Sequence, residues 1–178
     1  FFANYKKIPQ IVKEENTNSR EFWMFIGALV FFLSVIFIIA KTSLPLVNKI
    51  FGTSFAPPQD VEFSYNKVAV MIAIIIGLLT AIGQYLKYKD TTRAYLLKKI
   101  VWPTVIAAVL TLLMAIAYPL QFHKHGAGFL VSLYLAAFAA LYAVVANAMY
   151  LITVQKAKLF SIGGSVSHAG FALMLLGM

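Results

Sequence analysis

The sequence contains no cysteine and few acidic residues. Because cysteine is absent from all 178 residues, disulfides, thiolate metal ligands and thiol nucleophiles are excluded. Charged residues make up only 12% of the chain. All six acids lie outside the long apolar segments: Glu14, Glu15, Glu21, Asp60, Glu62 and Asp90. The sequence therefore offers no carboxylates for a proton relay inside those segments.

Long apolar segments dominate the rest of the sequence. Hydrophobic residues make up 61% of the chain, and the mean hydropathy is +0.83. Four runs can each cross about 30 Å of hydrocarbon as a helix, and a fifth is shorter. The five runs are residues 22–40, 68–86, 100–120, 128–154 and 165–178. Since backbone groups cannot stay unpaired in lipid, we predict an all-α, polytopic helical membrane bundle with at least four full transmembrane helices and a truncated fifth.

The segments between these runs suggest how the chain is organised. We expect residues 1–21 to form a cytoplasmic segment and residues 22–178 to form the bundle. An external loop is predicted at 41–67, where three prolines oppose a continuous helix, and a basic cytoplasmic loop at 87–99. Because the chain begins with Phe1 and ends inside an apolar run, both ends are expected to be truncated.

The basic residues predict the orientation of the bundle. Of the 15 Lys and Arg residues, 11 fall in the N-terminal segment and the loops on the same side, against 4 on the other side. Positively charged loops remain in the cytoplasm, so the N-terminus is predicted to be cytoplasmic. The net charge of +9 follows from these loops, which can also attract anionic lipid. No basic patch with exposed aromatics on a polar domain indicates nucleic-acid binding.

His168 is the candidate site residue. It lies near the start of the last apolar run, where an ionisable side chain needs a partner. A neutral imidazole can bind a metal or haem iron through one nitrogen. It can equally form a hydrogen bond to a neighbouring helix at an interface of small residues. If His168 binds haem iron, its ring nitrogen is expected to face the bundle interior, and Gly164 and Gly170 are expected not to face lipid.

The other polar residues near or within the runs are weaker candidates for a functional site. His123 and His125 occupy a tight turn and are expected to contact solvent or lipid headgroups, with metal or haem ligation as the alternative. Thr80, Gln84 and Asn147 lie within apolar runs, and such residues usually bridge helices.

Four features in order along the chain resemble one family. Ser19-Arg20-Glu21 precedes an apolar span, and a long proline-containing loop closes on the Tyr65-Asn66-Lys67-Val68 segment. A span and a basic loop follow, and the chain ends with a Gly163-Gly164-Ser-Val-Ser-His168-Ala-Gly170 segment. Together they resemble the later part of the CcmF-type cytochrome c assembly proteins, also described as cytochrome c haem lyases.

The resemblance implies a function in haem handling. Members of this family hold a b-type haem within the bacterial cytoplasmic membrane and help to attach haem to apocytochrome c on the outer face. By resemblance, His168 would be one of two histidines that ligate the iron of haem b, and the other would lie upstream of Phe1. Membrane lipid, haem, apocytochrome c and other cytochrome c maturation proteins would then be the partners.

The chain also departs from the family pattern. Its two tryptophans, Trp23 and Trp102, form no tryptophan-rich external segment, and the external haem-ligating histidines are expected upstream. This chain alone is therefore expected neither to bind the external haem nor to catalyse attachment. Two other functions remain open, a secondary transporter and a non-catalytic membrane scaffold subunit.

Overall fold

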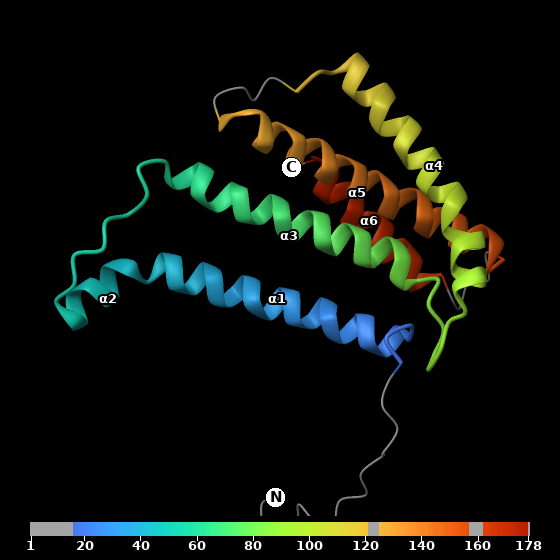
Figure 1. Ribbon diagram of the computed structural model, residues 1–178, viewed down its shortest axis with the longest axis horizontal. Coiled ribbons are helices and arrows are strands. Elements are labelled where there is room, and N and C mark those ends of the chain that lie inside the picture. The colour runs from blue at the N-terminus through green and yellow to red at the C-terminus, as the bar shows by residue number, and fades with distance from the viewer. Residues whose placement is uncertain (1–15, 121–124, 157–161, 178) are drawn as a thin grey trace, which may run out of the picture.

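The computed structural model describes residues 16–120, 125–156 and 162–177. These residues form helices and connecting loops, without a strand among them. The helices are α1 (Arg20–Thr42), α2 (Leu44–Phe51), α3 (Val61–Gly83), α4 (Arg93–Ala117), α5 (Ala127–Thr153) and α6 (Gly163–Gly177) (Figure 1). The predicted all-α helical bundle is confirmed.

Four of these helices are long and apolar enough to cross a membrane. They are α1, α3, α4 and α5, with 23, 23, 25 and 27 residues. At the helical rise each is roughly 34 Å long or more, which exceeds the hydrocarbon thickness of about 30 Å. The prediction of at least four membrane-spanning helices is therefore confirmed, and the chain is that of a membrane protein. The described part of α6 has 15 residues and is shorter than that thickness.

The segment predicted as a loop at 41–67 contains more helix than expected. The proline of α2, Pro45, lies in its first turn, where a backbone N–H has no helical partner to lose. Gly52 ends α2 in the left-handed conformation with a φ of 63°. The Asp60 side chain then caps α3 by accepting a hydrogen bond of 2.8 Å from the N–H of Phe63. These local signals leave only residues 52–60 as the connection.

The predicted basic loop at 87–99 is also partly helical. Helix α4 begins at Arg93, so the basic pair Lys98 and Lys99 belongs to its first two turns. The helix continues through Pro103, which is buried. The basic residues therefore extend from the loop onto the end of a spanning helix.

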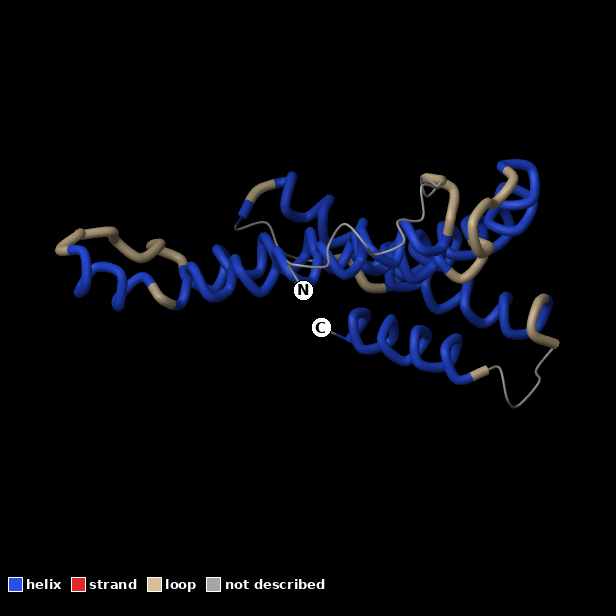
Figure 2. Tube along the Cα trace, turned by 90° about the horizontal axis from the view of Figure 1, so that it is seen from below, coloured by secondary structure: helices blue, strands red, loops and turns tan. Residues whose placement is uncertain are grey.

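Helix α5 is the centre of the bundle. It packs against α3, α4 and α6, whereas α1 contacts mainly α3 and has no buried residue of its own. Figure 1 shows α1, α3 and α5 side by side, and in the view of Figure 2 α6 lies on one side of the other helices. Because α1 is apolar but packs on one side only, most of its surface suits contact with lipid.

Helices α3 and α5 approach each other closely at Gly77. A Cβ placed on Gly77 would lie 3.0 Å from the Ala139 Cβ and 3.1 Å from the Ala139 carbonyl carbon and oxygen. Small residues allow the backbones of membrane helices to approach in this way. The Asn147 amide donates a hydrogen bond of 3.2 Å to the Thr80 carbonyl oxygen, which confirms the prediction that Asn147 bridges helices.

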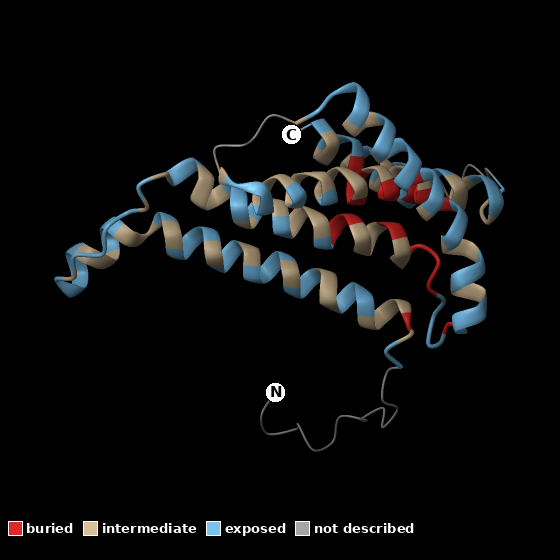
Figure 3. Cartoon of the chain, turned by 45° about the horizontal axis from the view of Figure 1, so that its top comes forward, coloured by how far each residue is buried: buried red, intermediate tan, exposed pale blue. Residues whose placement is uncertain are grey.

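The buried residues gather at one end of the bundle. Figure 3 shows them along the C-terminal parts of α3 and α5. There the Tyr85 hydroxyl donates a hydrogen bond of 2.8 Å to the Ala146 carbonyl oxygen. Burial raises the pKa of Tyr85, so this hydroxyl remains a neutral donor. The opposite end, near the starts of α3 and α5, has few buried residues.

Candidate functional site

His168 lies on the side of α6 that faces the bundle. It is half-buried, and the two buried residues of α6, Ser165 and Ala172, lie three positions before it and four after it. Residues at these spacings share one helix face. The Ser165 hydroxyl lies 3.1 Å from the Gln155 side-chain oxygen and donates to it, which ties α6 to the segment after α5. The imidazole therefore belongs to the packed side of α6.

The surface beside the imidazole is open. Helical side chains lean toward the preceding turn, which for His168 contains Gly164 and Ser165. A Cβ on Gly164 would meet no heavy atom within 4 Å outside its own helix, and the same holds for Gly170. At 100° per residue, Gly164 lies beside His168 on the helix surface, whereas Gly170 lies on the far side.

Gly164 and Gly170 pack against no neighbouring helix of the described chain, and their avoidance of lipid when His168 binds haem stays a prediction. Both glycines are exposed, because α6 turns Ser165 and Ala172 toward α5 and leaves the glycines outside that contact. The glycine-rich composition around His168 therefore does not form a helix interface within this chain. It leaves free volume beside the imidazole, which a flat ligand can use.

The Ser19-Arg20-Glu21 triplet lies at the same end of the bundle as His168. The Ser19 hydroxyl caps α1 by accepting a hydrogen bond from Phe22 N–H, and Arg20 N–H donates one of 3.0 Å to the Lys87 carbonyl oxygen. A Glu21 carboxylate oxygen accepts a hydrogen bond of 3.2 Å from Lys89 N–H. The triplet thus fastens the start of α1 to the α3–α4 loop.

The two described histidines lie at opposite ends of the bundle. His168 is near the start of α6, whereas His125 precedes α5 and shares a pocket with Leu175 and Leu176 at the end of α6. His123 lies outside the described residues. Across the described ranges, no group of three or more His, Cys, Asp or Glu side chains could hold a metal ion. The described chain therefore offers a haem iron one imidazole at the His168 site.

His125 does not occupy the solvated turn that the sequence suggested. Its ring stacks on Phe63 with a centroid distance of 3.9 Å and an interplanar angle of 6°. Its Nε2 lies 4.0 Å from an Asp60 carboxylate oxygen, and its side chain is only 18% exposed. The aromatic edge of Phe129 completes its surroundings at 5.8 Å. The missed signal was the Asp60–Phe63 pair at the start of α3, which only the tertiary structure brings to the start of α5.

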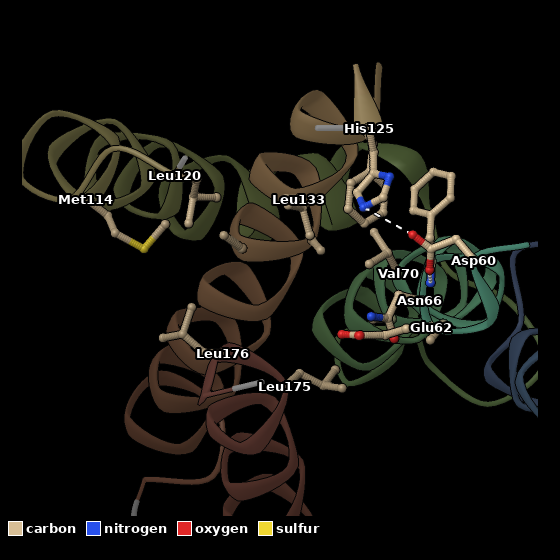
Figure 4. Close-up of a pocket in the computed structure, with 16 residues that line it drawn as sticks. Asp60, Glu62, Asn66, Val70, Met114, Leu120, His125, Leu133, Leu175 and Leu176 are labelled. Atoms are coloured by element: carbon tan, nitrogen blue, oxygen red, sulfur yellow. Dashed lines mark hydrogen bonds and ion pairs between the residues drawn. The ribbon is translucent and has the colours of Figure 1, made fainter. Parts of the chain in front are cut away.

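These contacts form the rim of a cavity of about 660 Å³, which we call the α3–α5 pocket. Its polar lining residues are Asp60, Glu62, Asn66 and His125 (Figure 4). Its apolar lining residues come from four helices and adjoining loops: Phe63, Ala69, Val70, Ala73, Met114, Leu120, Phe129, Leu133, Ala136, Ala137, Leu175 and Leu176. The volume and the few polar groups at one side are typical of pockets for small molecules.

The chain presents two separate candidate sites, a single imidazole beside open helix surface and a lined pocket at the other end. The first suits an axial ligand to a metal in a flat macrocycle, because neutral imidazole is a common haem ligand. The second suits an amphipathic molecule. No family model, curated protein or solved structure matches the chain.

Proposed function

We propose that this chain is part of a membrane haem-handling protein of cytochrome c maturation, in which His168 is an axial ligand of a b-type haem. The observation that carries the proposal is the position of His168. Its imidazole is on the bundle side of α6, and the helix surface one turn before it, at Gly164, has no neighbour within 4 Å. A macrocycle needs such a free surface next to the ligand that holds its iron.

The fastened end of the bundle supports the same proposal. An iron ligand must be held at a fixed position, and its supporting contacts matter almost as much as the ligand itself. The hydrogen bond from Ser165 to Gln155 holds α6 directly before His168. The buried contacts of α3 and α5 lie at this end as well. Apocytochrome c and other maturation proteins are the proposed partners, by the family resemblance.

The absorption spectrum of the purified full-length protein tests the proposal. We expect a Soret band and the reduced-minus-oxidised difference peaks of a b-type haem, either as purified or after reconstitution with haem. The sharp difference peaks require low-spin iron with axial ligands, whereas unbound haem gives only a broad Soret band. A spectrum that stays featureless after reconstitution would contradict haem handling and favour a transporter or a scaffold subunit.

We also propose that the end of the bundle holding the Ser19-Arg20-Glu21 triplet faces the cytoplasm of a bacterial cell. Single cysteines introduced at Asn18 or Asp90 should react with a membrane-impermeant thiol reagent only from the cytoplasmic side, and one at Gln59 only from outside. The chain has no native cysteine to confuse the labelling. Asn18 and Asp90 are joined through Asn16, which accepts from Asn18 N–H and donates to the Asp90 carboxylate. Opposite labelling would reverse the orientation.

A further inference from the structure

The α3–α5 pocket differs in charge from the rest of the chain. The chain has a formal charge of +9, yet the described residues that line the pocket include the carboxylates of Asp60 and Glu62, with no Lys or Arg among them. Figure 4 shows Glu62 and Asn66 projecting from α3 toward the space that α5 and α6 close on the other side. A ligand that enters here meets negative charge and hydrogen-bond acceptors at the rim.

Away from Asp60 and Glu62, the described lining of the pocket is apolar, and small side chains line it on both α3 and α5. Ala69 and Ala73 line it from α3, and Ala136 and Ala137 line it from α5. One helical turn after Ala73, Gly77 of α3 lies in close contact with Ala139 of α5. Polar groups at the mouth and small apolar side chains below them match a molecule with a cationic head and a slender apolar tail.

We propose that the α3–α5 pocket binds a phospholipid with a primary-amine headgroup, with the ammonium at Asp60 and Glu62 and one acyl chain in the alanine-lined part. A primary ammonium offers three N–H donors to the carboxylates and to the Asn66 amide oxygen. The bilayer supplies such a lipid directly to a pocket between spanning helices. This site is independent of the proposed haem ligand, which lies at the other end of the bundle.

Native mass spectrometry of the purified full-length protein tests the lipid preference. Phosphatidylethanolamine, phosphatidylcholine and phosphatidylglycerol with identical acyl chains are titrated separately. Since an ion pair at a partly exposed rim contributes up to about 1 kcal/mol, we expect phosphatidylethanolamine to bind about fivefold more tightly than phosphatidylglycerol. Phosphatidylcholine, which keeps the charge but lacks the N–H donors, should fall between them.

Variants separate headgroup recognition from filling of the apolar part. Asp60→Asn with Glu62→Gln should remove the preference among headgroups, and the helix should survive because asparagine also caps helices well. Ala136→Phe should weaken binding of all three lipids alike, because the added ring occupies the acyl-chain volume. The matched control is Asp90→Asn at the opposite end, which should leave the preference unchanged.

Two results would overturn the proposal. One is equal binding of the three lipids by the unaltered protein, or tighter binding of phosphatidylglycerol. The other is a preference for phosphatidylethanolamine that persists in the Asp60→Asn, Glu62→Gln protein. Because no haem spectrum enters this measurement, its outcome is separate from that of the proposed haem function.

Discussion

Replacement of His168 by alanine in the full-length protein is expected to remove the b-type haem spectrum and the cytochrome c assembly activity together. Mutating even the groups that orient a metal ligand costs about 10- to 100-fold in affinity, so losing the ligand itself should lower haem occupancy by at least about tenfold. Haem content per protein, measured from the Soret band, gives the result. His123→Ala and His125→Ala should keep both the spectrum and the activity.

An unaltered spectrum in His168→Ala would contradict the ligand assignment. The hydrogen-bond alternative would then apply, and the variant would show only a loss of stability. A second pair of variants tests the open surface independently of the imidazole. Gly164 and Gly170 are both exposed with no neighbour within 4 Å, but only Gly164 lies beside His168 on the helix surface. Gly164→Leu should therefore exclude haem, whereas Gly170→Leu should retain it.

Enlarging Gly77 is expected to cause the largest loss of stability among substitutions in the bundle. A single added Cβ at this position already lies 3.0 Å from Ala139 Cβ and 3.1 Å from Ala139 backbone atoms. Overpacking typically costs about 1–3 kcal/mol, occasionally more. Gly77→Ala should fall at the lower end of that range. Gly77→Leu should exceed it, because backbone atoms cannot rotate away and the two helices must separate.

Thermal unfolding in detergent measures this effect. Separating α3 from α5 also breaks the hydrogen bonds from Asn147 to Thr80 and from Tyr85 to Ala146, so the midpoint should fall steeply for Gly77→Leu. Gly83 is the matched control, since it is on the same helix and an added Cβ there meets nothing within 4 Å. Gly83 is the last residue of α3, so its substitution gains no more helix propensity than that of the interior Gly77, and propensity does not account for the expected loss. Equal midpoints for Gly77→Leu and Gly83→Leu would show that the crossing tolerates expansion.

The starts of α2 and α3 illustrate how far local sequence signals extend. Pro45, Gly52 and Asp60 each have a local effect that is readable without a structure, namely a first-turn proline, a left-handed helix end and an N-cap. The three prolines between residues 41 and 67 nevertheless predict a loop, because together they oppose a continuous helix. At its own helix position, however, each of these three residues is a start or stop signal for α2 or for the earlier start of α3.

By itself, the sequence determined the helical class, the four spanning segments and the polar ends between them. These follow from the cost of an unpaired backbone in lipid, which depends only on the length and composition of each run. The tertiary structure decided which faces of those helices meet. It directed Gly77 onto Ala139, left Gly164 open beside His168, and placed His125 against Phe63 and Asp60. Such contacts join residues far apart in the chain, and in an almost uniformly apolar helix no periodic pattern marks one face for packing.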